Sequence, residues 1–156
     1  MELDALDRSL VRVLLEEPRA GSREYARILG VARGTVQSRL ARLERGGVIT
    51  SYQPQIATRA MGFDVDAFVQ LQLAQGRLDQ VTAGLAAIPE VLQAYSTTGE
   101  GDLLCHVVAR DNSQMEQIVQ VILTLPGVVR SRTEIALKER VPYRVLPLLQ
   151  RAATEG

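Results

Sequence analysis

Residues 97–104 have the sequence TTGEGDLL, in which two glycines alternate with two acids before the chain becomes apolar. A loop of this composition could bind a phosphate, a metal ion or another small ligand, or could simply turn the chain between two strands. A phosphate loop is disfavoured, because GEG is not a Walker sequence, no Lys or Arg follows it, and Glu100 and Asp102 would repel a phosphate. A metal site would need more converging ligands. A ligand-binding loop and a simple turn both stay open as interpretations.

Cys105 and His106 are the only cysteine and the only histidine of the chain. A single cysteine forms no internal disulfide, and zinc sites usually draw several Cys and His ligands, so we expect no metal. The two residues are adjacent on a predicted strand, where neighbouring side chains point to opposite faces. A catalytic Cys–His pair is therefore disfavoured, and we expect both residues to serve packing or a dimer contact.

The size and hydropathy of the chain are ordinary for a globular protein. Its 156 residues are 46% hydrophobic and 23% charged, and they suffice for one medium domain or two small ones. No apolar run approaches the roughly 20 residues that span a bilayer. The N-terminus has no basic segment followed by an apolar one, as a signal peptide would. We therefore expect a cytoplasmic protein with no membrane partner.

The net charge is zero, but the charges are distributed unevenly. Residues 19–59 carry eight arginines and two acids, a net charge of +6, whereas residues 61–156 carry eight basic and eleven acidic residues, a net charge of −3. A basic segment attracts polyanions, and nucleic acid is the commonest polyanion in a cytoplasm.

Three short helices are predicted in the N-terminal third of the chain. Apolar residues recur at helical spacing up to Pro18, which stops the first helix. Ser22 is suited to cap the second helix, and Gly30 to end it in a left-handed conformation. The segment VARGTVQSRLARLERGG contains the third helix, and VITSYQPQI after it predicts a strand or a short hairpin closed by Pro54. A tight turn between the second and third helices is typical of a helix-turn-helix.

The third helix has one apolar face and one polar face. If Val36, Leu40 and Leu43 point inward, the outward positions are small and polar near the start of the helix and basic toward its end. Such a face can enter a major groove, read base edges and bind phosphates. The alternative is a solvated surface helix, but a solvated helix normally mixes both signs of charge, and this face is poor in acids. DNA binding is therefore the favoured interpretation.

The remaining residues predict the order βαββαβ, which is ferredoxin-like. Its third strand is apolar on both faces, so a sheet with helices on one side would leave an apolar face uncovered. A second copy of the chain is the simplest partner for that face, and a symmetric dimer would also present two recognition helices to DNA. The predicted strands are 63–73, 91–99, 102–109 and 128–139, and the predicted helices are 77–90 and 111–127.

Five segments, in this order along nearly the whole chain, resemble the Lrp/AsnC (feast/famine) family of transcriptional regulators: LDALDRSLVRVL, VARGTVQSRLARLERGGVI, MGFDVDAFV, TTGEGDLL and LPGVVRSRTEIAL. The resemblance implies an α+β fold, with a winged helix-turn-helix DNA-binding domain over 1–52 and a strand linker over 53–63. A ferredoxin-like effector-binding and oligomerisation domain is expected over 64–150. It also implies double-stranded DNA as a partner, and homodimers that assemble to octamers or similar rings.

The resemblance places the expected sites on particular residues. The recognition-helix match covers residues 33–42, so the expected DNA-binding residues are Arg33, Gly34, Thr35, Gln37, Ser38, Arg39 and Arg42. The family's effector, commonly an amino acid, binds between dimers near a glycine–aspartate loop and a threonine of the fourth strand. The expected effector-binding residues are Thr98, Gly99, Glu100, Gly101, Asp102 and Thr133, and no cofactor is expected.

The chemistry of an amino acid fits this loop. Glu100 or Asp102 could pair with the ammonium group, and backbone N–H groups made accessible by Gly99 and Gly101 could bind the carboxylate. Thr133 could add a hydroxyl group. The sequence therefore favours a sensing loop, while the effector itself is not identified.

Two positions depart from the family pattern. Ala32 stands where the family usually has a serine before the recognition helix, which removes a cap worth about 1 kcal/mol and leaves the start of the helix less fixed. Gly101 stands where the family often has an aromatic residue, so we expect an enlarged or looser pocket.

Two other functions are weighed against a ligand-gated regulator. Siroheme decarboxylases resemble the same two-domain architecture, but the single histidine and the basic N-terminal segment favour a regulator over an enzyme. A regulator that ignores ligands and responds only through oligomerisation is the second alternative, and Gly101 keeps it open.

Overall fold

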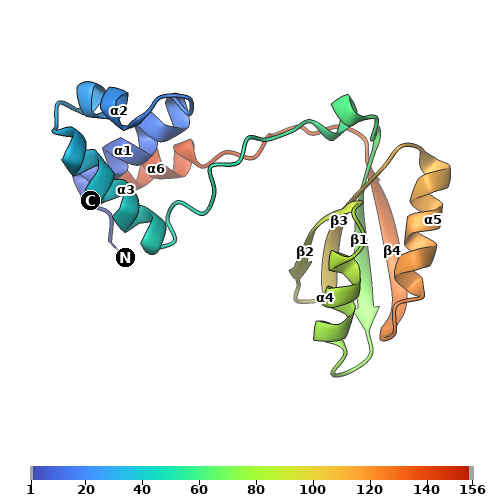
Figure 1. Cartoon of the computed structure of the whole chain (residues 1–156). Helices are drawn as coiled ribbons and strands as arrows, with labels where there is room; N and C mark the ends of the chain where they lie inside the picture. The colour runs from blue at the N-terminus through green and yellow to red at the C-terminus, as the bar shows by residue number, and fades with distance from the viewer. Residues whose placement is uncertain (1, 155–156) are drawn as a thin grey trace. The chain divides into compact units, whose positions relative to one another are not determined.

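The computed structural model describes residues 2–154 and contains two compact units (Figure 1). One unit consists of the described residues of Met1–Pro54 and Val141–Gly156, and the other is Gln55–Arg140. The C-terminal domain was predicted over 64–150, whereas Val141 and the residues after it lie in the same compact unit as the N-terminal helices.

Four helices form the first unit: α1 (Ala5–Glu16), α2 (Ser22–Leu29), α3 (Arg33–Arg45) and α6 (Leu146–Thr154). The first three enclose a core whose fully or nearly fully buried members include Leu10, Val36 and Leu43. Tyr25 also lies in this core, and its hydroxyl group donates a hydrogen bond to the Glu17 carbonyl at 3.0 Å. The predicted inward face of the third helix is confirmed at Val36 and Leu43.

The helix ends confirm two predictions and correct one. Gly30 ends α2 with φ 66°, the left-handed conformation that glycine adopts without strain. Ala32 precedes α3 and makes no side-chain cap, as the sequence indicates. Ser22, however, is the first helical residue and not the cap of α2, because the Gly21 carbonyl already accepts the N–H groups of Glu24 and Tyr25.

α6 is an element that the sequence interpretation missed. It packs against α1, and its Leu146 and Leu149 are half-buried. This contact is the reason that the C-terminal segment belongs to the first unit. Apolar residues at helical spacing after Pro142 would have indicated it.

The predicted strand over 48–56 is wrong. The segment after α3 runs without strand pairing to a single 3₁₀ turn, η1 (Thr58–Met61), so the predicted wing is not formed among the described residues. Pro54 has no N–H group to donate, and an isolated extended segment keeps its backbone hydrogen-bonded to water.

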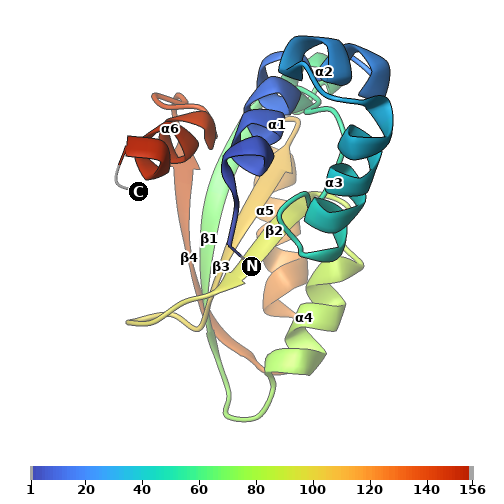
Figure 2. The ribbon, with the colours of Figure 1, turned by 90° about the vertical axis from the view of Figure 1, so that its left-hand side faces the viewer.

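The second unit confirms the predicted βαββαβ order. Its antiparallel sheet has the order β2-β3-β1-β4, and α4 and α5 cover one face of it (Figure 2). Alternate β1 residues enter the core, namely Ala67, Val69 and Leu71, which are fully buried. The elements are β1 (Val65–Leu73), α4 (Leu78–Ala86), β2 (Val91–Ser96), β3 (Leu103–Ala109), α5 (Asn112–Leu123) and β4 (Val128–Ala136).

Asp111 caps α5, and its carboxylate accepts the Gln114 N–H at 2.8 Å. The predicted placement of Cys105 and His106 on opposite faces of the strand is confirmed. Cys105 is fully buried beneath the helices, and burial raises the pKa of its thiol to about 11. His106 lies on the opposite face of β3, where its ring stacks on Phe68 at 5.3 Å between centroids.

Candidate nucleic-acid interface and ligand loop

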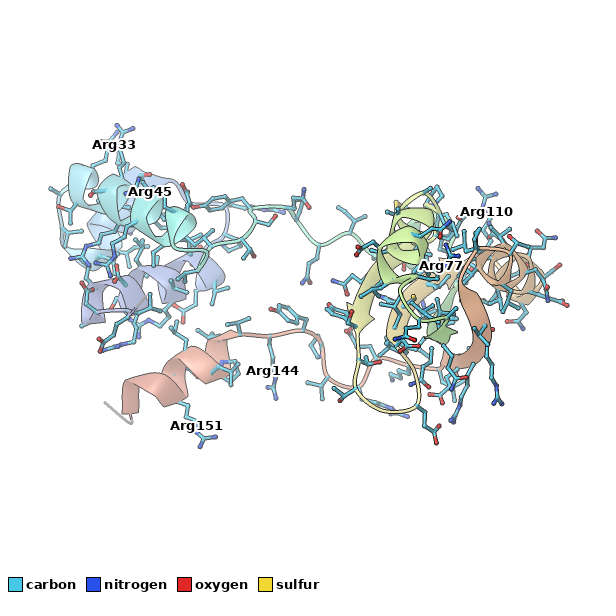
Figure 3. The ribbon with its side chains drawn as sticks, turned by 90° about the horizontal axis from the view of Figure 1, so that it is seen from below. Arg33, Arg45, Arg77, Arg110, Arg144 and Arg151 are labelled. Atoms are coloured by element: carbon cyan, nitrogen blue, oxygen red, sulfur yellow. The ribbon has the colours of Figure 1, made fainter. Side chains whose placement is uncertain are left out.

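The first half of α3 presents an exposed polar surface. Arg33, Gly34, Thr35, Gln37 and Ser38 are all exposed, in agreement with the predicted outward face. The side chain of Arg33 extends away from the helix in Figure 3. Small and hydrogen-bonding side chains at these positions allow close approach to base edges.

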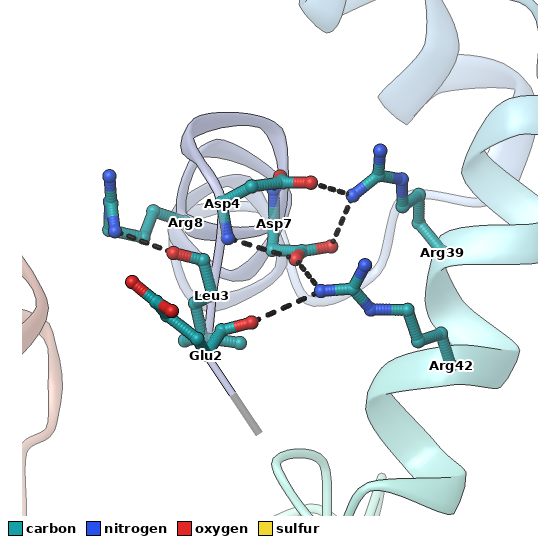
Figure 4. Close-up of polar contacts among 7 residues, drawn as sticks. All are labelled: Glu2, Leu3, Asp4, Asp7, Arg8, Arg39 and Arg42. Carbon is teal, nitrogen blue, oxygen red and sulfur yellow. Dashed lines mark hydrogen bonds and ion pairs between the residues drawn. The ribbon is translucent and has the colours of Figure 1, made fainter.

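Arg39 and Arg42, which were also predicted to bind DNA, contact the start of α1 (Figure 4). The Asp7 carboxylate accepts Arg39 Nη1 at 3.1 Å through Oδ1 and Arg42 Nη2 at 2.6 Å through Oδ2. Asp4 pairs with Arg39 as well. Asp7 is fully buried, whereas the side chains of Arg39 and Arg42 keep 28% and 39% of their surface exposed.

Asp4 and Asp7 also form a capping box at the start of α1. The Asp7 N–H donates to Asp4 Oδ1 at 2.9 Å, and the Asp4 N–H donates to Asp7 Oδ2 at 3.1 Å. The hydrogen bond from Arg39, and after it the one from the Asp7 backbone, lowers the pKa of Asp4 to about 2. Hydrogen bonds to the carboxylate of Asp4 and, after it, to that of Asp7 raise the pKa of Arg39.

The sequence interpretation missed this cluster. Two acids three residues apart before an apolar run are a recognisable capping signal, so the start of α1 was predictable. The pairing with arginines more than thirty residues away was not, because helical periodicity places a side chain on a face without identifying its neighbour.

Hydrogen bonds within the loop between β2 and β3, and from the loop to β1, fix its conformation. Asp102 Oδ2 accepts the Leu73 N–H at 2.7 Å, and the Asp102 N–H donates to the Leu71 carbonyl at 2.8 Å. The Thr97 hydroxyl donates to the Gly101 carbonyl at 2.9 Å. Asp102, a predicted partner for an ammonium group, therefore already joins the loop to the end of β1.

Gly101 is buried against the side chain of Gln70. A Cβ added at Gly101 would lie 2.3 Å from Gln70 Cγ, so only glycine fits without displacing that side chain. The predicted enlarged pocket is wrong at this point, because Gln70 fills the space that a larger residue at 101 would need.

A small cavity of about 100 Å³ lies beside this loop. Glu100 is the one predicted effector residue that lines it. Thr133 does not, and it pairs in register with Val69, while Ser131 of the same strand does reach the cavity. The other lining residues, which the sequence interpretation did not single out, are Gln70, Gln72, Arg130 and Arg132.

Both signs of charge and two amides meet at the cavity. Gln72 Nε2 donates to the Glu100 carbonyl at 2.6 Å, which ties β1 to the loop. Arg132 pairs with Glu134 at 2.8 Å on the same strand. Gln70 and Gln72 alternate along β1, and Arg130 and Arg132 alternate along β4, so a period-two count of polar residues on the two strands is the signal that would have found these four.

Residues 2–154 contain neither a cluster of metal ligands nor a membrane-spanning helix. No three His, Cys, Asp or Glu side chains there come together as ligands for a metal ion. No helix in that range combines the length and the apolar character that crossing a membrane requires.

Two family models match the chain. The Lrp/AsnC ligand binding domain matches residues 66–146, and the AsnC-type helix-turn-helix domain matches residues 3–44. The HTH-type transcriptional regulator FL11 of Pyrococcus horikoshii is 29% identical over 146 residues, which cover 94% of this chain and 97% of that protein. The relatives found are transcriptional regulators and not enzymes, which argues against the decarboxylase alternative.

Solved structures agree with these matches. The leucine response regulatory protein LrpA of Mycobacterium tuberculosis is 34% identical with a TM-score of 0.82, over 93% of this chain and 100% of that one. The transcriptional regulator NMB0573 of Neisseria meningitidis, solved in complex with L-Met, is 25% identical with a TM-score of 0.85, over 94% of this chain and 97% of that one.

Proposed function

Since the chain belongs to the Lrp/AsnC family of transcriptional regulators, we propose that its helical unit binds operator DNA through α3 and that its sheet unit binds an amino acid beside the loop at 97–102. The exposed polar start of α3 is the observation that supports the first part. We propose Arg33, Gly34, Thr35, Gln37 and Ser38 as its DNA-contacting residues.

The DNA site can be tested with duplexes that the wild-type protein selects from a random pool. Binding of each variant to these duplexes is then measured. Gln37→Ala and Ser38→Ala should change which sequence is selected, because their side chains would face base edges, each worth about 1–3 kcal/mol of discrimination. Arg33→Gln should weaken binding to all sequences and flatten its salt dependence. Arg77→Gln, in the other unit, is the control. Unchanged preference in both α3 variants would contradict the assignment.

The cavity beside the loop supports amino-acid binding. Arg130 and Arg132 suit the carboxylate of an amino acid, Glu100 suits its ammonium group, and Gln70 and Gln72 offer amides to either. The similarity to a regulator solved with L-Met points to the same ligand class. At about 100 Å³ the cavity is smaller than an ordinary ligand pocket of about 300 Å³ or more, so we propose that a second copy of the chain completes it.

The predicted loop residues then have distinct roles in the proposal. Glu100 contacts the ligand, whereas Thr98, Gly99, Gly101 and Asp102 shape the loop that carries Glu100. Thr133 lies outside the cavity, and we assign it no contact within one copy.

A thermal-shift screen of the twenty amino acids tests this site. A ligand at 100 times its Kd stabilises the folded state by about 2.7 kcal/mol, which raises the melting temperature. Glu100→Gln should abolish the shift, while Glu116→Gln, on the exposed side of α5, should preserve it. The absence of any shift with all twenty would instead support the regulator that responds only through oligomerisation.

The uncovered face of the sheet supports a homodimer, with assembly to an octamer or a similar ring. Phe68 and Tyr95 lie on that face and remain 43% and 55% exposed. Sedimentation of Phe68→Asp against wild type tests this, and a smaller particle is expected. Because operator DNA is the target, we propose a cytoplasmic location for the regulator.

A further inference from the structure

Arg39 and Arg42 leave α3 on the side that faces α1 and converge on one carboxylate (Figure 4). Asp7 accepts one guanidinium on each oxygen, and Oδ2 additionally accepts the Asp4 N–H. Arg42 Nη2 also donates to the Glu2 carbonyl at 3.2 Å. The first turn of α1 thus holds two arginines of the helix that is expected to read DNA.

This cluster is neutral by itself. Asp4 and Asp7 balance the charges of Arg39 and Arg42, so these two arginines add little to the field that DNA meets. Within residues 2–154, no acid lies within ion-pair distance of Arg33 or Arg45, the arginines at the two ends of α3. The free positive charge of α3 is therefore at its ends.

The apolar contacts of α3 determine which face is buried, but they are not directional. Val36 and Leu43 bury apolar surface, which is a non-directional attraction, and the N-terminus of α3 has no side-chain cap. Charge-assisted hydrogen bonds from planar guanidinium groups are directional, and a carboxylate that is fully buried depends on them.

We propose that Asp7 is a positioning residue for DNA recognition, and that Arg39 and Arg42 act through it to fix the orientation of α3 instead of binding phosphate. This inference rests on the proposed DNA-binding function and replaces the phosphate role that the sequence suggested for these two arginines.

Salt dependence separates the two roles. Log affinity falls with log salt by about 0.9 for each phosphate contact. Arg39→Gln and Arg42→Gln should each weaken binding to selected DNA about ten-fold at fixed salt while leaving the slope unchanged. Arg45→Gln, on the exposed end of the same helix, should reduce the slope. A reduction of the slope by Arg42→Gln as large as that by Arg45→Gln would overturn the proposal.

A double-mutant cycle provides the second test. If Arg42 acts through Asp7, the variant with both Asp7→Asn and Arg42→Gln should bind selected DNA within two-fold of Asp7→Asn alone. If Arg42 contacts DNA independently, the two losses multiply, and the proposal fails.

Arg42→Lys keeps the experiment decisive where Asp7→Asn does not fold. Lysine retains the charge that a phosphate needs, but it lacks the planar, rigid guanidinium group whose Nη2 donates to both Asp7 Oδ2 and the Glu2 carbonyl. At a temperature where circular dichroism shows full folding, the ratio of affinities for selected and random duplexes should fall about ten-fold. A purely structural role would leave that ratio unchanged.

Hydrogen exchange on the free protein distinguishes failure of this inference from failure of DNA binding itself. Arg42→Lys should speed exchange in the first turn of α1 and in α3, and leave the strands of the other unit unchanged. Unaltered exchange in α1 and α3 would overturn the positioning role even if wild-type protein bound no DNA.

Discussion

The two units of this chain stabilise their interiors by different physical means. The unit of α1, α2 and α3 has an apolar core and, in addition, the fully buried side chain of Asp7, which pairs with two partly exposed arginines. The core under the sheet is built from apolar side chains, and no charged side chain is fully buried there among the described residues. Its polar contacts lie at the loop and at the strand ends.

This difference corresponds to the work of each unit. Apolar burial is strong but non-directional, so it suits a platform that carries a cavity at one edge. A buried ion cluster contributes little net stability compared with a well-packed apolar core, yet it defines an orientation. A helix that reads base edges must be oriented as well as folded, and under our proposal the Asp7 cluster supplies that orientation.

The largest expected effect is in the apolar core. Leu71→Ala should destabilise the sheet unit by about 4 kcal/mol, because truncation of a fully buried leucine leaves a cavity. The neighbouring Cys105 reports it, since a buried thiol with a raised pKa resists alkylation until the unit opens. Alkylation at pH 8 should be much faster in the variant, and exchange in α1 and α3 should not change.

A smaller loss is expected at the buried charge. Asp7→Asn should destabilise the helical unit by about 3 kcal/mol, at the low end for breaking a buried ion pair, because both arginines keep contact with water. Urea denaturation followed by hydrogen exchange would locate the effect in α1 and α3. Faster exchange of β1 would contradict the separation of the two cores.

Overpacking at the loop should have a smaller effect still. Gly101→Ala forces Gln70 aside and should lower stability by about 1–2 kcal/mol. Gln70→Ala removes the obstructing atoms, so the double variant should recover most of the loss in thermal unfolding. Additive losses in the double variant would show that another contact makes glycine necessary.

The smallest effect concerns pH. The folded-state pKa of Asp4 is about 2, below its ordinary 3.8, so the charged form stabilises the folded state. That stabilisation is complete above pH 3.8 and is lost as the pH falls toward 2. The Asp4→Asn variant should not show this loss of stability between pH 3.8 and 2. Circular dichroism measured against pH would show the difference in acid unfolding of α1 and α3. An identical acid transition in both proteins would contradict it.

Short-range signals in the sequence predicted most of the fold. The opposite faces of Cys105 and His106 and the left-handed end at Gly30 depend on neighbouring residues, and both predictions are confirmed. The pairs that were missed join distant segments. Nothing in a helical repeat shows that Arg42 meets Asp7, or that Gln70 lies over Gly101.

The predicted site residues divide in the same way. Composition and family resemblance placed the ligand loop near the cavity, but Glu100 alone of those residues lines it. The arginines of β4 were missed because their relevance depends on strand register, which brings β1 and β4 together across the chain.

The return of α6 to α1 has a consequence for how the protein can be cut and rebuilt. Topologically the sheet unit is an insertion within the helical unit, since the chain enters it after Pro54 and leaves it before Val141. A single proteolytic cut in either connecting segment therefore leaves both fragments with a part of the helical unit. A short linker from Pro54 to Val141 would instead delete the sheet unit and keep the helical unit. A tag or a partner protein fused to either end of the sequence would be attached to the helical unit.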